Sequence, residues 1–581
     1  MTDGGGTGPR LVLGPLLRYV DETAVTVWVE TDRECQVETL GRQARTFEVA
    51  GHHYALVVID GLAPGTETEY QVTLDGTVCW PEPDGQGRPS VLRTLDPGRP
   101  LRLAFGSCRI AELPARPRRR WSRARPDPGR TGPDSATPDS NAPDRTEPDP
   151  SHGTDALAAW AEDLAGQPAA SWPDTLLLIG DQVYADDTGP ATRQFIAGRR
   201  DPSAPPGYQV ADFAEYCALY REAWTEPSVR WLLSVIPTAM IFDDHDVHDD
   251  WNISASWRRD YQAKPWWPER ISAAFQTYWI YQHLGNLSPA DLAKDELWRQ
   301  VTAAPGDAAA LLRDFAKRAD QPSGGVQWSF GRSFGRVRVV TIDSRAGRVL
   351  GNGPRRMIGE AEWEWVIQSA AGDWDHVVLA TSLPLLLPHG IHAMEAWNEA
   401  VCGGAWGKRF ARVGERLRRA ADLEHWAAFG TSFTEFGQLL AGLAAGTHGP
   451  PPASVTVISG DIHHSYLAQV GFPAGTRPRS AVYQAVCSPI HNLLPESFRR
   501  TQKLATSRAG ALAGTALARL ARVPRPEISW RITRGPWFRN MLCALEFDGR
   551  AARIRFAGAG QETPGSSRLE TLCETELSAP R

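Results

Sequence analysis

Residues 237–250 read Pro-Thr-Ala-Met-Ile-Phe-Asp-Asp-His-Asp-Val-His-Asp-Asp. A short, mostly apolar run ends abruptly in Asp243-Asp244-His245-Asp246, three carboxylates around one imidazole. Such a run is typical of a strand that is buried on both faces, as in parallel sheets. Carboxylates held this close together repel one another, so the cluster is costly to fold without a cation. A solvated surface loop is the alternative interpretation.

Four other strand-like runs end in the same way. They are followed by Gly106-Ser107-Cys108, by Gly180-Asp181 with Tyr184 three residues further on, by Asp343-Ser344-Arg345 and by Gly460-Asp461-Ile462-His463. Helical patterns such as 208–235 and 360–368 lie between the runs, so the sequence predicts an α/β fold. Ligands bind at the carboxyl ends of strands in open α/β sheets, and we expect these clusters to converge there. Converging carboxylates and imidazoles need positive charge between them, which metal ions supply.

Each motif taken alone also has an ordinary interpretation. Asp461 and His463 are two residues apart and therefore lie on one side of an extended segment, which is only moderately specific. The occurrence of all the motifs together, in this order and at strand ends, is what favours a metal site. The ordinary interpretations are a turn or helix N-cap for Gly180-Asp181, a core cysteine for Cys108, and a structural ion pair for Asp343 with Arg345.

The chain divides into a small β part and a large α/β part. Residues 1–97 alternate apolar and polar side chains, for example at 24–30, which predicts an all-β sandwich domain of fibronectin-like type. We interpret residues 98–581 as one catalytic domain with a Pro/Arg-rich insertion at about 113–153. That insertion has too little apolar surface to order itself. A β-hairpin is expected at about 541–557.

Composition excludes several classes of protein. The chain has 581 residues, a formal net charge of −6 and 22% charged residues, which gives no indication of a nucleic-acid partner. No apolar stretch is long enough to span a membrane; the nearest, 504–523, is interrupted by arginines and is typical of an amphipathic surface helix. No signal peptide or twin-arginine motif is visible, which predicts a cytoplasmic location. The eight scattered cysteines are expected to be reduced.

The set of motifs resembles that of PhoD-type alkaline phosphatases, a branch of the calcineurin-like metallophosphatases. The resemblance runs from about residue 102 to about residue 467 and includes the helical stretch 213–233. It implies a four-layer αββα sandwich preceded by a small all-β domain. It also implies hydrolysis of small phosphomonoesters or phosphodiesters by a metal-activated hydroxide, with iron (Fe3+) and calcium (Ca2+) as cofactors.

Carried over residue by residue, the resemblance implies a role for each motif. Cys108 and Tyr184 would bind ferric iron, and Asp181 would bridge the metals. Asp244 occupies the place where related phosphatases carry a metal-binding Asn, and Asp461 with His463 would complete the metal ligands. His245 would be the general acid or a phosphate contact. Arg345 would neutralise a non-bridging oxygen of the phosphoryl group.

One strand end departs from the family pattern. The run 376–380 is followed by Thr381-Ser382-Leu383-Pro384, where many metallophosphatases place a metal-binding histidine. His389 and His392 follow and are candidates to replace it, although most loop histidines bind no metal. The departure keeps two other classes of function open: a non-catalytic binding or scaffold protein with a degenerate metallophosphatase core, and redox chemistry at a Tyr–Cys iron site.

Overall fold

The computed structural model describes most of the chain. In the part it describes, every helix is too short or too polar to cross a lipid bilayer. The predicted Pro/Arg-rich insertion falls almost entirely outside the described residues. The described residues are 8–82, 88–111, 152–321, 325–351, 353–494, 496, 507–560 and 568–578.

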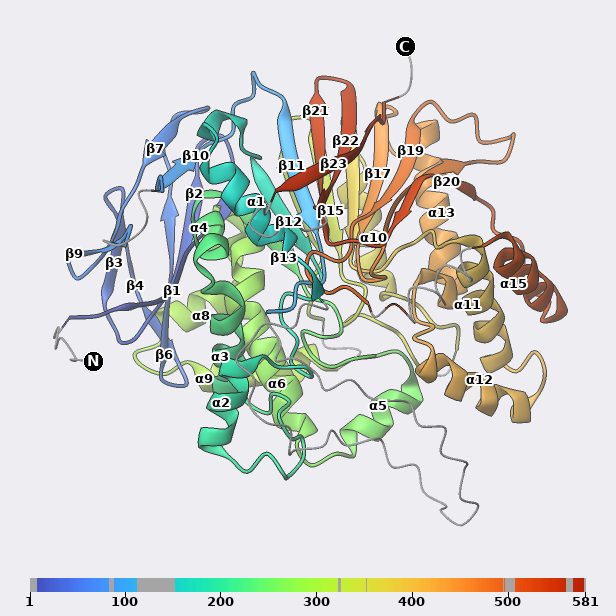
Figure 1. Cartoon of the computed structure of the whole chain (residues 1–581), viewed down its shortest axis with the longest axis horizontal. Coiled ribbons are helices and arrows are strands. Elements are labelled where there is room, and N and C mark those ends of the chain that lie inside the picture. Colours follow the sequence, from blue (N-terminus) through green and yellow to red (C-terminus); the bar gives the residue numbers. More distant parts are fainter. Residues whose placement is uncertain are drawn as a thin grey trace.

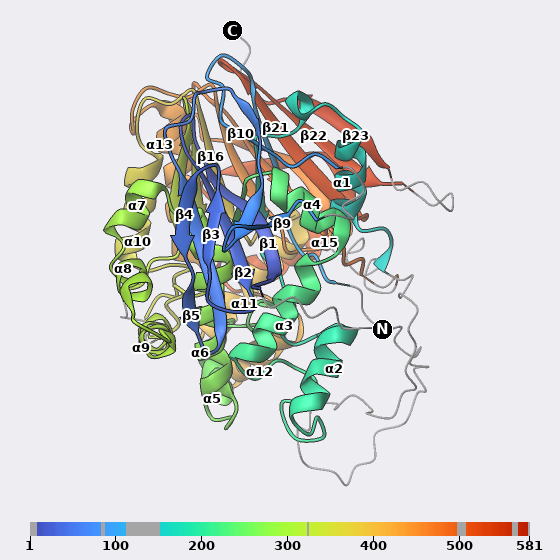
Figure 2. The ribbon, with the colours of Figure 1, turned by 90° about the vertical axis from the view of Figure 1, so that its left-hand side faces the viewer.

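The amino-terminal part is all β, as predicted. Two four-stranded antiparallel sheets make up most of it, with strand orders β1-β2-β6-β5 and β4-β3-β8-β9. Figure 2 views these strands in front of the rest of the molecule. The strands are β1 (Leu11–Val20), β2 (Val25–Thr31), β3 (Gln36–Thr39), β4 (Arg42–Arg45), β5 (Phe47–Val49), β6 (His52–Ile59), β7 (Glu67–Glu69), β8 (Val72–Leu74), β9 (Thr77–Trp80) and β10 (Val91–Arg93).

Two mixed sheets form the centre of the α/β part. The first has six strands in the order β13-β12-β11-β21-β22-β23, and the second has seven in the order β14-β15-β16-β17-β19-β18-β20. The predicted hairpin is the β21–β22 pair. The first sheet contains β11 (Leu101–Gly106), β12 (Thr175–Ile179), β13 (Thr238–Ile241), β21 (Met541–Asp548), β22 (Ala551–Ala559) and β23 (Leu569–Glu576). The second contains β14 (Phe330–Phe334), β15 (Val337–Ile342), β16 (His376–Thr381), β17 (Ser454–Ser459), β18 (Ser465–Gly471), β19 (Ala481–Val486) and β20 (Ser529–Trp537).

The side chains of β16 show how the layers stack, because alternate residues of a strand face opposite sides. Val377 and Leu379 belong to the apolar cluster that includes α10 (Glu360–Ala370) and α13 (Gly430–Ala445). Val378 belongs to the other cluster, with the first sheet and α1 (Ala156–Ala165). The order of layers is therefore helices, second sheet, first sheet, helices (Figure 1), which confirms the predicted four-layer sandwich.

The remaining helices surround these layers, and the stretch 208–235 differs from its predicted single helix. It forms α3 (Phe213–Trp224) and α4 (Pro227–Val235). The break falls here because proline lacks the N–H that a continuing helix needs, and the Glu226 carboxylate accepts from the Val229 N–H as a new N-cap. The others are α2 (Pro190–Arg199), α5 (Ala255–Gln262), α6 (Trp267–Thr277), α7 (Pro289–Lys294), α8 (Glu296–Ala303), α9 (Ala309–Ala319), α11 (His389–Cys402), α12 (Lys408–Ala420) and α15 (Arg508–Leu520).

A buried arginine ties the amino-terminal part to the α/β part. Arg18 of β1 is fully buried, and its guanidinium donates to the carbonyls of Thr238 (2.9 Å), Gln282 (2.6 Å) and Tyr281. Burial, followed by the neighbouring charge of Arg332, lowers the pKa of Arg18 to about 9. Gln282 in turn donates from its side chain to Asp246 (3.0 Å), so the contact reaches the acidic loop that follows β13.

Candidate metal centre

The strand ends meet at one edge of both sheets. Strands β11, β12 and β13 run parallel, as do β15, β16, β17 and β19, so their carboxyl ends share an edge. The Asp461 N–H, after β17, donates to Ser107 Oγ, after β11, over 3.1 Å. Glycine is needed at this close approach, because a Cβ on Gly460 would lie 1.9 Å from that same oxygen. The two sheets therefore join through the loops at this edge.

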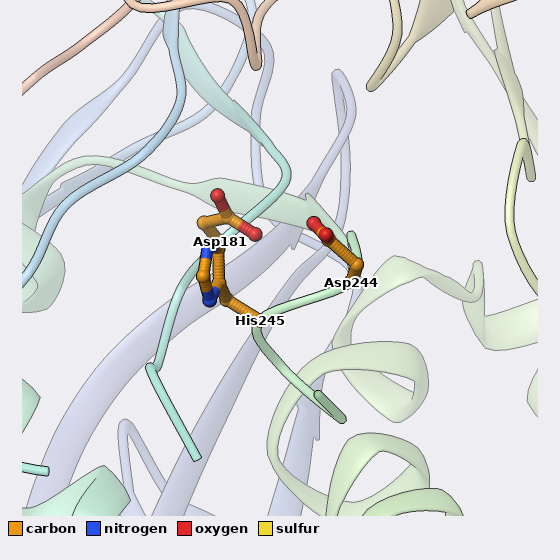
Figure 3. A group of neighbouring side chains, drawn as sticks. All are labelled: Asp181, Asp244 and His245. Carbon is orange, nitrogen blue, oxygen red and sulfur yellow. The ribbon is translucent and has the colours of Figure 1, made fainter. Parts of the chain in front are cut away.

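Two overlapping groups of ligand atoms lie at this edge. Asp181, Asp244 and His245 each offer one atom within 4.8 Å of the others, and Figure 3 shows Asp181 facing Asp244 and His245 across the gap between two loops. Asp243, Asp244 and Asp461 form a second group of the same kind. Asp244 belongs to both groups, so the loop after β13 lies at the centre of the site.

Unfavourable backbone conformations concentrate in the predicted ligands. Cys108, Asp181, Asp461 and His463 have φ of 59°, 49°, 65° and 54°. Non-glycine residues adopt this left-handed region rarely and at a cost, and they keep it where the surroundings hold them, often at functional sites. The structure thus holds four of the six predicted metal ligands in conformations that the local sequence alone does not favour.

The predicted iron ligands lie beside the carboxylates. The Tyr184 hydroxyl donates to Asp181 Oδ2 (3.3 Å) and accepts from Asn492 Nδ2 (3.0 Å). Cys108 Sγ is fully buried, 3.3 Å from the hydroxyls of Ser107 and Ser488. Burial, followed by the charge of Asp181, raises the pKa of both Tyr184 and Cys108 well above their usual values. Both groups therefore stay protonated unless a cation offsets the surrounding negative charge.

The two predicted histidines have different surroundings. His463 Nδ1 lies 2.7 Å from the Asn492 carbonyl, which leaves Nε2 as the atom able to bind a metal, and burial lowers its pKa. His245 Nδ1 lies 3.0 Å from Asp186. Although burial opposes the charged form, the carboxylates of Asp186 and Asp244 raise the pKa of His245 well above 6.5. The neighbouring carboxylates thus favour the protonated form of His245.

Arg345 lies inside the cluster of carboxylates. Its side chain is fully buried, pairs with Asp243 and Glu424, and has Nη2 3.1 Å from Asp244 Oδ1 and 3.8 Å from Asp461 Oδ1. The predicted contact with a phosphoryl oxygen remains a prediction. What the structure shows is a guanidinium that offsets the negative charge of the site.

Sequence reasoning missed His425 and Glu424. His425 Nε2 lies 2.9 Å from Asp461 Oδ2, and His425 Nδ1 lies 2.6 Å from Glu395 Oε1. Glu395 is on α11, and Glu424 and His425 follow α12, so no strand end marks them. The only local signal for a site here was the pair Glu424-His425, an acidic residue directly before a histidine. His389 and His392 have other partners: His389 Nε2 lies 3.1 Å from the Trp530 carbonyl, and His392 packs against Trp530 and Phe433.

The residues present fit bound cations. Asp181 Oδ1 and Asp243 Oδ2 are buried and lack a hydrogen-bond partner, which is costly for a carboxylate unless a cation takes the place of the partner. Burial together with neighbouring carboxylates raises the pKa of Asp181 and Asp243 well above 3.8. Oxygen ligands suit hard cations such as calcium, and a set that adds Tyr, His and Cys suits iron.

Comparison with known proteins agrees with this geometry. The sequence model of the PhoD-like phosphatases matches residues 159–518, more than half of the chain. The chain belongs to the PhoD-like phosphatase family. A domain of unknown function (DUF7800) matches residues 8–92 of this PhoD-like chain, and the search of curated proteins finds no match.

Solved structures agree on the fold. A structure described as "Structure of PhoD" superposes with a TM-score of 0.56 at 12% identity, covering 99% of this chain and 92% of that one. At this identity the likeness shows the fold alone. A maltogenic amylase from S. marinus, at a TM-score of 0.16 and 9% identity over 100% of this chain and 84% of that one, carries no argument.

Proposed function

We propose that this PhoD-like chain is a metal-dependent phosphoesterase that acts on small phosphomonoesters, phosphodiesters or both. The observation that carries the proposal is the convergence of Asp181, Asp244 and His245 at the joined strand ends. The unpartnered buried oxygen of Asp181 adds to it. Such an arrangement is stable when a cation neutralises it, and metal-assisted hydrolysis is the chemistry that a site of this composition supports.

The ligands divide by their chemistry. We propose that Cys108, Tyr184 and His463 would hold iron, that Asp244 and Asp461 would contribute to a site for calcium, and that Asp181 would be a ligand shared by both sites. When bound, such ions lower the pKa of water and neutralise charge on a phosphoryl group. Two described contacts place the iron candidates next to the carboxylates: the Tyr184 hydroxyl donates to Asp181 Oδ2, and Cys108 Sγ lies 3.7 Å from the backbone carbonyl oxygen of Asp461.

The chain's own side chains supply the remaining functions. Asp186, 3.0 Å from His245 Nδ1, orients the imidazole and favours its protonated form, so that His245 could donate a proton from Nε2 to a leaving alkoxide. Arg345 keeps the neighbouring carboxylates in place. Glu395 orients His425 against Asp461 in the manner of the carboxylate–histidine pairs that support metal ligands.

We further propose residues 1–97 as a separate β domain.

The test is hydrolysis of p-nitrophenyl phosphate and its bis-ester, together with metal analysis of the purified protein. Asp181→Asn should lower turnover by more than about 100-fold, because a residue that only orients a metal ligand costs about 10–100-fold when it is replaced. The variant should keep the circular dichroism spectrum of the wild type. Asp373→Asn is the matched control, because Asp373 is 66% exposed and pairs with Arg336. Normal turnover in Asp181→Asn would refute the bridging role. Hydrolysis of neither ester by metal-loaded protein would favour the non-catalytic alternative, against which the retained Asp181, His245 and His463 argue.

A further inference from the structure

Helices α12 and α15 expose large apolar side chains. Among the described residues, the four most exposed large hydrophobic side chains are Leu512 (74%), Leu520 (69%), Val413 (60%) and Phe410 (54%), and all four lie on these two helices. Leu417, at 37% exposure, adds a fifth. Single exposed apolar residues need no explanation, but a concentration of them marks an interaction site.

The exposed side chains lie on two helices that Trp406 links at one end. Phe410, Val413 and Leu417 follow helical spacing on α12, and Leu512 and Leu520 are two turns apart on α15, so each set shares a helix face. Trp406 connects the two helices. Its Nε1 donates to the Leu520 carbonyl (3.3 Å), and its ring lies 5.9 Å from that of Phe410. We call this surface, made of Trp406, Phe410, Val413, Leu417, Leu512 and Leu520, the apolar corner.

Basic side chains surround the apolar corner, although the whole chain carries a net charge of −6. Helix α15 contains no acidic residue. The one carboxylate on α12, Glu415, is partly buried and pairs with Arg418 over 3.1 Å. The exposed basic residues on and next to the two helices are Lys408, Arg409, Arg412, Arg416, Arg508, Arg519 and Arg522.

We propose that the apolar corner docks on an anionic lipid surface. Helices that bind at a bilayer interface place Leu, Val, Phe and Trp among the acyl chains and Lys or Arg at the headgroups. Basic residues near an anionic leaflet add attraction that salt weakens. A nucleic acid would satisfy the arginines but leave the leucines in water, so the combination of charge and exposed aliphatic side chains favours lipid.

The position of the corner agrees with this role. Figure 1 shows α12 and α15 at the outer edge of the molecule, on the side away from the amino-terminal sheets. Helix α11 connects the corner to the metal centre. Glu395 of α11 contacts His425. Near the start of α11, the backbone of Gly390 packs closely on α15, since a Cβ on Gly514 would lie 2.8 Å from the Gly390 carbonyl oxygen. Docking would therefore hold the metal centre at a fixed place relative to the bilayer, whatever reaction it catalyses.

The experiment is flotation of the full-length protein with vesicles of phosphatidylglycerol and phosphatidylcholine, compared with vesicles of phosphatidylcholine alone. We expect binding to the anionic vesicles that falls at least tenfold when salt is raised from 50 mM to 500 mM. The double variant Leu512→Gln/Leu520→Gln should lose at least tenfold in binding. Val78→Gln is the matched control, since Val78 is 50% exposed on β9 of the amino-terminal part.

Three outcomes would overturn the proposal. They are an absence of binding to anionic vesicles, equal binding by the Leu512→Gln/Leu520→Gln and Val78→Gln variants, and a lipid-free dimer that the leucine variant abolishes in sedimentation velocity. The last would show that a second copy of the chain covers the corner. Ester hydrolysis by the leucine variant in solution should stay normal, which separates this proposal from the proposed phosphoesterase activity.

Discussion

Arg345 provides the sharpest test of how the site is held together. Replacing it in Arg345→Met removes a fully buried guanidinium from among Asp243, Asp244, Glu424 and Asp461. Methionine keeps much of the apolar volume, so the change acts mainly on charge. Removing one partner of a buried ion pair costs about 3–5 kcal/mol, because the other charge stays buried without compensation. We expect a loss of this size in metal-free protein.

The pH dependence follows from the same contacts. Arg345 and Arg348 lower the pKa of Glu424 in the folded protein despite its burial. In the wild type, this carboxylate therefore stabilises the fold at pH values above the pKa that Glu424 has in the unfolded chain. That contribution to stability is lost as the pH falls. In the variant, burial without Arg345 raises that pKa, and Glu424 must take up a proton to stay buried. The difference in stability between wild type and variant should therefore be larger at pH 8 than at pH 5.

The assay is the urea midpoint of metal-free protein, followed by tryptophan fluorescence at both pH values. Arg45→Met is the matched control, because Arg45 pairs with Glu34 at 76% and 56% exposure, and an exposed pair contributes about 0–1 kcal/mol. Adding Glu424→Gln to Arg345→Met should recover part of the loss. If Arg345→Met shifts the midpoint no more than Arg45→Met does, or shifts it equally at both pH values, the buried-charge reasoning is wrong.

Three further predictions concern the packing around the site. Gly460→Ala should destabilise the protein by about 1–3 kcal/mol, as overpacking does, because the new Cβ would lie 1.9 Å from Ser107 Oγ. Adding Ser107→Gly should restore part of the lost stability. Thermal unfolding of the single and double variants measures both effects. His425→Ala should weaken calcium binding by about 10–100-fold in titration calorimetry, whereas unchanged affinity would show that His425 does not support Asp461. Arg18→Met should lower the free energy of unfolding by about 3 kcal/mol or more, measured by urea denaturation, since three buried carbonyls lose charged donors.

Local sequence was sufficient for the strands and for the residues that follow them. Each apolar run, such as 237–242 or 376–380, forms a buried strand within one or two residues of the predicted bounds, because strands buried on both faces need continuous apolar sequence. The polar residues directly after them converge, because parallel strands place their carboxyl ends at one edge. Local sequence gave a wrong prediction for the stretch 208–235. Its apolar period continues past Pro227, but the structure has two helices there instead of one, because proline cannot continue the first helix.

The sequence by itself determined the fold class, the family resemblance and the strand-end residues such as Asp181, Asp244 and His463. Only the tertiary structure decided what surrounds them. Glu395 lies on α11 and His425 lies in the loop after α12, so the contacts from Glu395 to His425 and from His425 to Asp461 depend on how these segments pack, which no spacing along the chain encodes. The place of Arg345 is a tertiary fact for the same reason: a charged side chain after a strand can point to substrate or into the protein, and the carboxylates that hold it inward come from three other segments of the chain.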